Sequence, residues 1–455
     1  MGKKKKDRSN HISTVISNHF GEIPVADLVT AYRQFPVTAR VDLQRALEKI
    51  FTDRFESKVY GTHRDYEFNT LKFSDFLEVD SNNAVVMGPL QFDEVDVGDQ
   101  FPARCLKNAL WVCRSENTPF AVLVAVADRH HGEEVTIGIA VPPGESEINL
   151  SHTFLQEIEQ LVNKSGSYRG KVISLEQGSR YSGKSGAVRV HKLHQVSRED
   201  VILPSKTIDL LDRNVKEFIE FRPRLRQLGM AGKKGLLFYG PPGTGKTHTI
   251  HYLANQLPEH TTLLITAGQV GLLEEYFLLA RFLQPAMVVI EDADLIARDR
   301  TTMNSPCEES LLNRLLNEMD GLREDAEILF VLTTNRPEQL ESALASRPGR
   351  IDQAIEFPLP DADGRRKLLK LYSRGLEISD ELLELTVKRI ENASPAFIKE
   401  LMRRAAQRYL QGESTGPLTE EHIKNSLEDM LFSGGSLNVK LLGGALSNEA
   451  AASVS

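Results

Sequence analysis

An eight-residue segment at positions 240–247 constrains the fold of this chain more than any other feature. It reads Gly-Pro-Pro-Gly-Thr-Gly-Lys-Thr, which matches the pattern GxxxxGK followed by Ser or Thr. The apolar run at 235–239 before it predicts a strand, and the run at 249–257 after it predicts a helix. Glycines let the loop turn its backbone N–H groups inward at the helix N-terminus, where they attract phosphate oxygens. The segment therefore predicts a nucleotide site in an α/β fold, with Lys246 on the β- and γ-phosphates and the Thr247 hydroxyl on Mg²⁺.

The nucleotide is expected to contact this whole segment and the residue after it. The expected binding residues are Gly240, Pro241, Pro242, Gly243, Thr244, Gly245, Lys246, Thr247 and His248. A dinucleotide fingerprint does not fit, because GxGxxG is absent here and the lysine suits a phosphate.

Polar residues follow two further apolar runs. Glu291 and Asp292 come directly after the run at 287–290, and Asn335 follows the run at 330–334. We expect Glu291 to orient Mg²⁺ through its waters and Asp292 to act as the base that polarises the attacking water. Ligands of open α/β sheets bind at the carboxyl edge, so Asn335 is expected to sense the γ-phosphate there. An ordinary acidic strand end and a turn-forming Asn are the plainer alternatives.

Two arginines stand three residues apart on a turn that contains Pro and Gly, at Arg347 and Arg350. Burying either guanidinium without a partner would be costly. They either pair with nearby acids or stabilise the charge of a transferring phosphate as arginine fingers.

Composition excludes several classes of protein. Among 455 residues, 63 are acidic and 55 basic, a net charge of −8 that argues against a nucleic-acid-coating protein. The three cysteines show no CxxC spacing, which argues against a disulfide scaffold or zinc site and fits the cytoplasm. No apolar run approaches 18 residues, so we expect no membrane span.

The patterns along the chain predict five parts. Apolar residues at helical spacing, such as Leu43 and Leu47, indicate a helical start. Strand-like runs follow at 120–126, 134–141, 171–175 and 187–191, the first two as a hairpin. Strands then alternate with helices, and only helical patterns follow. The predicted parts are a helical N-terminal segment (1–60), an α+β domain that recruits a partner (61–195), an α/β nucleotide-binding domain (196–360), a helical domain (361–432) and a flexible tail (433–455).

Three stretches together resemble the AAA family of ATPases, of the bacterial type. They are Leu-Leu-Asn-Arg-Leu-Leu-Asn-Glu-Met-Asp-Gly-Leu at 311–322, Thr-Thr-Asn-Arg-Pro at 333–337 and Arg-Pro-Gly-Arg-Ile-Asp at 347–352. The resemblance extends from about residue 210 to residue 431, roughly half the chain. It implies the parallel sheet of a P-loop NTPase with a C-terminal helical lid, in a ring that is usually a hexamer with ATP at each subunit interface.

The resemblance also implies roles for single residues. Arg347 and Arg350 would act in trans on the nucleotide of the neighbouring subunit. The segment that begins at Asp320 would signal between subunits. Tyr372 and Ala396 would lie near the base and the ribose.

The chain departs from the family pattern at four places. Glu291-Asp292 replaces the usual Asp-Glu, an order also familiar from active relatives of the mitochondrial translocase that moves the folded Rieske protein. Gln269 stands where members that thread polypeptides carry an aromatic residue. The arginine segment is one residue longer than usual, and Ser394-Pro-Ala replaces Ser-Gly-Ala.

These features predict a cytoplasmic, ring-forming ATPase that converts ATP and water to ADP and phosphate and remodels or moves a macromolecule. A protein substrate or adaptor, contacted through residues 1–195, is the expected partner. An ATP-gated scaffold with little turnover is one alternative, motivated by the Glu291-Asp292 order. The other is a nucleic-acid-associated ATPase, supported only by the lysines at 3–6 and the basic stretch at 164–194.

Overall fold

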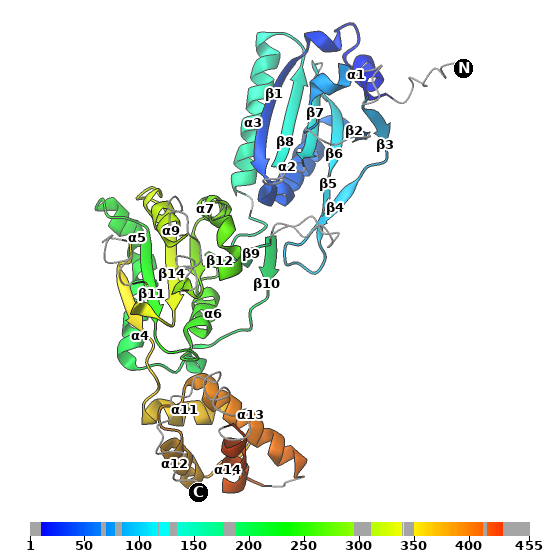
Figure 1. Cartoon of the computed structure of the whole chain (residues 1–455). Helices are drawn as coiled ribbons and strands as arrows, with labels where there is room; N and C mark the ends of the chain where they lie inside the picture. Colours follow the sequence, from blue (N-terminus) through cyan, green and yellow to red (C-terminus); the bar gives the residue numbers. More distant parts are fainter. Residues whose placement is uncertain are drawn as a thin grey trace, which may run out of the picture. The chain divides into compact units, whose positions relative to one another are not determined.

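The computed structural model divides the chain into two compact units, which we describe separately. The first comprises Met1–Arg169 and Ser174–His191, and the second comprises Gly170–Ile173 and Lys192–Ser455 (Figure 1). The structure describes residues 11–64, 70–77, 84–116, 118–127, 134–164, 166–176, 188–294, 311–338, 340, 350–412 and 416–430. The predicted tail at 433–455 lies outside these residues. Within them, none of the helices is both long and apolar enough to cross a lipid bilayer.

An antiparallel sheet with the strand order β1-β8-β7-β6-β2-β3 forms the centre of the first unit. Its strands are β1 (Val29–Pro36), β2 (Glu56–His63), β3 (Val86–Gly88), β6 (Asn108–Ser115), β7 (Thr118–Ala127) and β8 (Glu134–Val141). A separate ribbon pairs β4 (Phe92–Val95) with β5 (Ala103–Leu106). The helices are α1 (Ile12–Phe20), α2 (Arg40–Asp53) and α3 (Glu145–Lys164), with 3-10 turns η2 (Val25–Asp27), η3 (Val37–Ala39) and η4 (Phe73–Leu77).

Both faces of this sheet are covered, because consecutive side chains of a strand point to opposite faces. Leu110 of β6 belongs to a core cluster with Ile16 of α1. The next residue, Trp111, stacks on Phe51 of α2 with the ring centroids 5.2 Å apart. Strands covered on two faces are apolar throughout, which explains the continuous apolar run in β7.

The prediction of a helical segment at 1–60 is only partly right, because this region also contains two strands. It contains the predicted helix, now α2, whose Leu43 and Leu47 are buried. It also contains β1 and β2, and β1 pairs with β8 over eight residues, from Val29 to Pro36. The residues that pair with β1 lie about a hundred positions further along the chain, so local periodicity alone did not reveal this strand.

The second unit is built on a parallel sheet with the order β9-β12-β13-β14-β11-β15. The strands are β9 (Val172–Leu175), β11 (Lys234–Tyr239), β12 (Thr261–Ile265), β13 (Ala286–Ile290), β14 (Ile328–Thr334) and β15 (Gln353–Glu356). The strands β11, β13 and β14 contribute Phe238, Val289 and Val331 to one core cluster with Ile250 of helix α6. The apolar runs that predicted these strands are therefore the centre of a sheet buried on both faces.

The expected boundary at residue 195 does not coincide with the boundary of this sheet. Val172 and Ile173 were assigned to the α+β domain, yet they pair in parallel with Thr262 and Leu263 of β12. Ser174 and Leu175, with the neighbouring strand β10 (Val188–His191), are grouped with the first unit. A four-residue apolar strand carries no local signal for the sheet that it joins.

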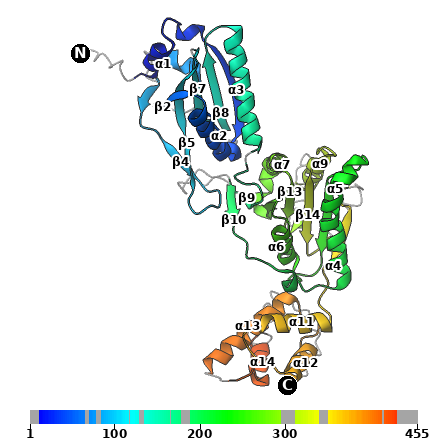
Figure 2. The same cartoon turned by 180° about the vertical axis from the view of Figure 1, so that it is seen from behind.

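Helices surround the parallel sheet and then form a group of their own. Around the sheet are α4 (Ser205–Leu211), α5 (Phe218–Gln227), α6 (Lys246–Gln256), α7 (Leu273–Phe282) and α9 (Leu311–Asp320). The π-helical segment η6 (Asp212–Glu217) lies between α4 and α5, and η5 (Arg198–Asp200) and η7 (Ala267–Leu272) are 3-10 helices. The last group, orange to red in Figure 2, contains α11 (Ala362–Tyr372), α12 (Asp380–Arg389), α13 (Pro395–Gln411) and α14 (Glu420–Glu428). We call these four helices the lid.

The lid has its own core, which includes Leu368, Leu383 and Phe397. Its helices begin where the sequence supplies an N-cap. Asp361 accepts the N–H of Gly364 at 2.7 Å, and serine hydroxyls cap α12 and α13. Such caps satisfy backbone donors that a helix leaves free at its first turn. The lid therefore folds around local start signals and one apolar cluster.

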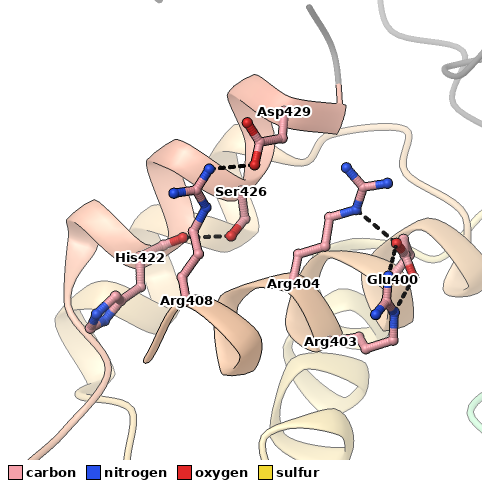
Figure 3. Close-up of polar contacts among 7 residues, drawn as sticks. All are labelled: Glu400, Arg403, Arg404, Arg408, His422, Ser426 and Asp429. Carbon is pink, nitrogen blue, oxygen red and sulfur yellow. Dashed lines mark hydrogen bonds and ion pairs between the residues drawn. The ribbon is translucent and has the colours of Figure 1, made fainter. Parts of the chain in front are cut away.

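Partly exposed charged side chains join the helices α13 and α14 of the lid (Figure 3). Arg408 pairs with Asp429, which directly follows α14. On the same helix, Glu400 accepts hydrogen bonds from both Arg403 and Arg404, at 2.7 Å. These arginines lower the pKa of Glu400 to about 2. Ion pairs at exposed positions contribute about 0–1 kcal/mol each, so the apolar core contributes more to the stability of the lid.

Candidate nucleotide-binding and catalytic site

The phosphate loop, residues 240–245, connects β11 to the N-terminus of α6. Gly243 and Gly245 have φ angles of 77° and 98°. Residues with a side chain rarely adopt such angles, so glycine is needed at both positions. Gly245 is also the N-cap of α6. The first amides of a helix have no partner within it, and here they follow directly from the loop, as a phosphate site requires.

Lys246 is buried, and its ammonium lies within the curve of the loop. Its Nζ donates to the carbonyl oxygens of Gly240 at 2.8 Å and Pro241 at 2.9 Å. Burial lowers the pKa of Lys246 to about 8, although the carboxylates of Asp292 and Asp294 act in the opposite direction. The lysine is thus next to the loop and close to two carboxylates, as a residue that neutralises phosphate charge should be.

An oxygen pair suited to Mg²⁺ lies at the start of α6. The hydroxyl of Thr247 donates to Oε1 of Glu291 at 2.8 Å. Mg²⁺ prefers such hard oxygens and is usually held by one or two protein groups together with waters and phosphates. Elsewhere in the described part of the chain, no cluster of three or more His, Cys, Asp or Glu side chains could hold a metal. The pair therefore fits a nucleotide-linked Mg²⁺ rather than a metal held by protein ligands alone.

The expected base and the expected sensor are in contact. Asn335 Nδ2 donates to Asp292 Oδ1 at 3.2 Å. The two residues follow β13 and β14, which are parallel neighbours, so both strands end at the same edge of the sheet. Asp292 has a φ of 51°, rare for a residue with a side chain. Its N–H donates to the hydroxyl of Thr333 at 3.0 Å, which holds this unusual backbone in place.

The N-terminus of the lid helix α13 rests on the phosphate loop. The N–H of Ala396 donates to the carbonyl of Gly243 at 3.1 Å. A Cβ at Gly243 would lie only 2.9 Å from the Cβ of Ala396 and 3.0 Å from the hydroxyl of Ser394. The resemblance placed Ala396 near base and ribose, and in this chain Ala396 lies directly against the loop that would hold the phosphates.

Sequence reasoning missed Asp200, which links the nucleotide domain to the lid. Its backbone carbonyl accepts from Nε2 of His248 at 3.2 Å, and its carboxylate accepts from Arg374 at 3.2 Å. Burial raises the pKa of Tyr372, and the nearby Asp200 carboxylate raises it further. The available signal was the spacing Ser197-x-x-Asp200, which closes a capping box in the structure. His248 and Tyr372 therefore both lie close to Asp200, as expected for two residues that contact the same nucleotide.

Of the two arginines predicted as arginine fingers, the structure describes only Arg350. Arg347 lies outside the described residues. The side chain of Arg350 is only 10% exposed and forms an ion pair with Asp320 of its own chain. Nη1 of Arg350 is buried without a hydrogen-bond partner among the described residues. Within one chain Arg350 thus pairs with an acid, which is the first of the two alternatives that the sequence left open. Its action on the nucleotide of a neighbouring subunit stays a prediction.

Gln269 closes a turn after β12. Its Oε1 accepts from the N–H of Thr266 at 3.1 Å and from the hydroxyl of the same residue at 3.2 Å. The side chain is half-buried and is engaged locally.

The family described as ATPase family associated with various cellular activities (AAA) matches residues 236–359. A proteasome-activating nucleotidase of Methanothermobacter thermautotrophicus is 34% identical over 218 residues, 44% of this chain and 53% of the relative. A cell division cycle protein 48 homolog of Archaeoglobus fulgidus is 33% identical over 241 residues, 48% of this chain and 33% of the relative. A 26S proteasome regulatory subunit 8 homolog of Encephalitozoon cuniculi is 29% identical over 319 residues, 62% of this chain and 80% of the relative.

The chain spans about half the length of the first of these relatives and a third of the second. The family match begins within β11 and ends just beyond β15, so it covers the strands that carry the phosphate loop, Asp292 and Asn335. The predicted α/β fold with a parallel P-loop NTPase sheet, preceded by an antiparallel-sheet unit, is confirmed. The sequence match and the geometry of the sheet edge agree, and residues 236–359 of this chain form an AAA ATPase domain.

Proposed function

We propose that this protein hydrolyses ATP with the help of Mg²⁺ and works as a ring, a hexamer, that remodels or moves a protein partner in the cytoplasm. The observation that carries the proposal is the contact between Asn335 Nδ2 and Asp292 Oδ1, 3.2 Å apart. It unites a base and a γ-phosphate sensor at the sheet edge where Thr247 and Glu291 also meet. A carboxylate that can accept a proton and an amide beside it that can orient a water support hydrolysis rather than binding alone.

Each residue of the site has a separate role in the proposed hydrolysis of ATP. The backbone of the phosphate loop and the ammonium of Lys246 hold the β- and γ-phosphates. Thr247 and Glu291 would hold Mg²⁺, which would neutralise phosphate charge. Asp292 accepts a proton from water, whose oxygen bonds to the γ-phosphorus while the bond to the bridging oxygen breaks. Asn335 orients that water, and the products are ADP and phosphate.

The position of Asp292 supports hydrolysis despite the inverted order of the acids. An aspartate reaches one methylene less far than a glutamate. The backbone of Asp292 is left-handed, and its N–H donates to the hydroxyl of Thr333. This backbone conformation fixes the position from which the short side chain of Asp292 extends. Strained backbone of this kind clusters at functional sites because the surrounding structure must maintain it.

A ring and a protein partner are supported by the relatives, whose names describe a proteasome-activating nucleotidase and a regulatory subunit of the 26S proteasome. We extend this to Arg347 and Arg350 as residues that complete the site of the neighbouring subunit. Arg350 would then exchange its ion pair with Asp320 for phosphate. The first unit would recruit the protein partner or its adaptor.

The proposal is tested by measuring steady-state ATP turnover against protein concentration, with Asp292→Asn as the blank. Specific activity should rise with concentration, because each site needs a neighbour. Lys246→Ala should be inactive, and Arg347→Ala or Arg350→Ala should be inactive as well. Mixing Lys246→Ala with an arginine variant should restore some turnover, since hybrid rings contain complete sites.

The same assay separates the proposal from an ATP-gated scaffold. The pairing of Arg350 with Asp320 favours the scaffold, because it occupies one expected finger within its own chain. If turnover never exceeds the Asp292→Asn blank while ATP still binds in a Lys246-dependent manner, hydrolysis is refuted and the scaffold is favoured.

A further inference from the structure

Asp294 and Thr334 form a buried contact to which the mechanism above assigns no role. Oδ1 of Asp294 accepts from the hydroxyl of Thr334 at 2.9 Å. Asp294 is 4% exposed and Thr334 is fully buried. A buried carboxylate is costly unless hydrogen bonds compensate it, and an apolar residue would fill this volume at lower cost. The pair is therefore a candidate for a role other than stability.

The contact ties together the two strand ends from which the reacting groups project. Asp294 lies two residues after Asp292, and Thr334 directly precedes Asn335. The Thr334 hydroxyl also accepts the N–H of Arg336 at 2.9 Å, and Oδ1 of Asp294 lies 3.4 Å from the N–H of Asn335. The backbone on both sides of Asn335 is thus fixed by one carboxylate and one hydroxyl.

Both hydrogen-bond contacts of Asp294 Oδ1 therefore lie on the strand end that carries the sensor, one to the side chain before Asn335 and one to the backbone of Asn335 itself. Groups that orient ligating or reacting side chains in this way typically change affinity or activity 10- to 100-fold when they are removed.

We propose that Asp294 and Thr334 are positioning residues that hold Asn335 against Asp292 and in line with the γ-phosphate. Their role is to position Asn335, and neither is assigned a contact with the nucleotide. The inference rests on the proposed function, because it specifies how the sensor of that same site is placed. It differs from a purely structural role, which would change stability but not the recognition of the γ-phosphate.

The first test replaces Thr334 by Val, which keeps the shape and removes the hydroxyl. We expect kcat to fall about 10- to 100-fold. Thr334→Ser should keep kcat within about twofold of wild type, because it retains the hydroxyl. Thr262→Val is the matched control. Thr262 lies in β12 of the same sheet, is 1% exposed and has a hydroxyl without a hydrogen-bond partner among the described residues. This control should keep its kcat.

The second test asks whether Thr334 acts through Asn335. If it does, the double variant Thr334→Val with Asn335→Ala should be no slower than the slower single variant, since residues that act as one unit are not additive. Effects that multiply would overturn the inference. So would a kcat in Thr334→Val within twofold of wild type, or an equal loss in Thr334→Ser.

A binding measurement keeps the inference separate from the proposed function. The ratio of the affinities for ATPγS and ADP reports recognition of the γ-phosphate without turnover. Thr334→Val should lower this ratio as much as Asn335→Ala does, whereas Thr262→Val should not. A wild-type protein without turnover refutes hydrolysis, yet the ratio still tests the pair. An unchanged ratio in Thr334→Val overturns the inference, and Thr334→Ala provides the same test if the valine variant does not fold.

Discussion

Replacing Gly243 by alanine tests how closely the lid rests on the phosphate loop. The φ of Gly243 is 77°, and a left-handed angle costs a residue with a side chain about 1–2 kcal/mol. The new methyl would also lie 2.9 Å from the Cβ of Ala396, whereas carbon atoms pack best at about 3.5–4.0 Å. Overpacking of this kind costs about 1–3 kcal/mol. We therefore expect Gly243→Ala to lower the free energy of unfolding by about 2–5 kcal/mol.

Three further variants separate the two costs. Gly245 has a φ of 98°, but a Cβ there would meet no atom within 4 Å. Gly245→Ala should therefore show only the backbone cost, about 1–2 kcal/mol. Adding Ala396→Gly to Gly243→Ala makes room for the methyl and should recover most of the overpacking cost. Ala396→Gly alone should cost at most about 1 kcal/mol as a helix substitution.

The assay is urea unfolding of all four variants, followed by circular dichroism. The reasoning would be refuted if Gly243→Ala were no less stable than Gly245→Ala. It would equally be refuted if the double variant showed the sum of the single effects, because contacting residues must couple.

Three more predictions concern the same site. Burial lowers the pKa of Lys246 to about 8, so its ammonium is lost as the pH rises. The Kd for ATP should accordingly increase about tenfold between pH 7 and pH 9, and a Lys246→Arg variant should show no such rise. Thr247→Val removes the hydroxyl 2.8 Å from Glu291, so a Mg²⁺ titration of the ATPase should show a raised requirement and a kcat about 10- to 100-fold lower, which Thr247→Ser avoids. Ser394→Ala removes the cap of α13 and should lower the unfolding free energy by about 1 kcal/mol. It should also weaken nucleotide binding, whereas Ser379→Ala, which removes the cap of α12, should change stability alone.

The sequence by itself determined the chemistry of the phosphate loop and the class of the fold. Gly243, Gly245 and Lys246 lie within four consecutive residues, so their geometry and charge are local properties. The strands before Asp292 and Asn335 are apolar because the sheet is buried on both faces, and a run of apolar residues reports this directly. Ligands of open α/β sheets bind at the carboxyl edge, which allowed Asn335 to be predicted at the nucleotide site.

Only the tertiary structure decided the contacts between distant segments. It joined Val172 and Ile173 to the nucleotide sheet, placed Ala396 on the phosphate loop and paired Arg350 with Asp320. Each of these contacts joins residues that are 30 or more positions apart and follow no periodic pattern. Their formation depends on how the sheet and the lid pack, and that packing is set by the whole apolar core rather than by any one segment.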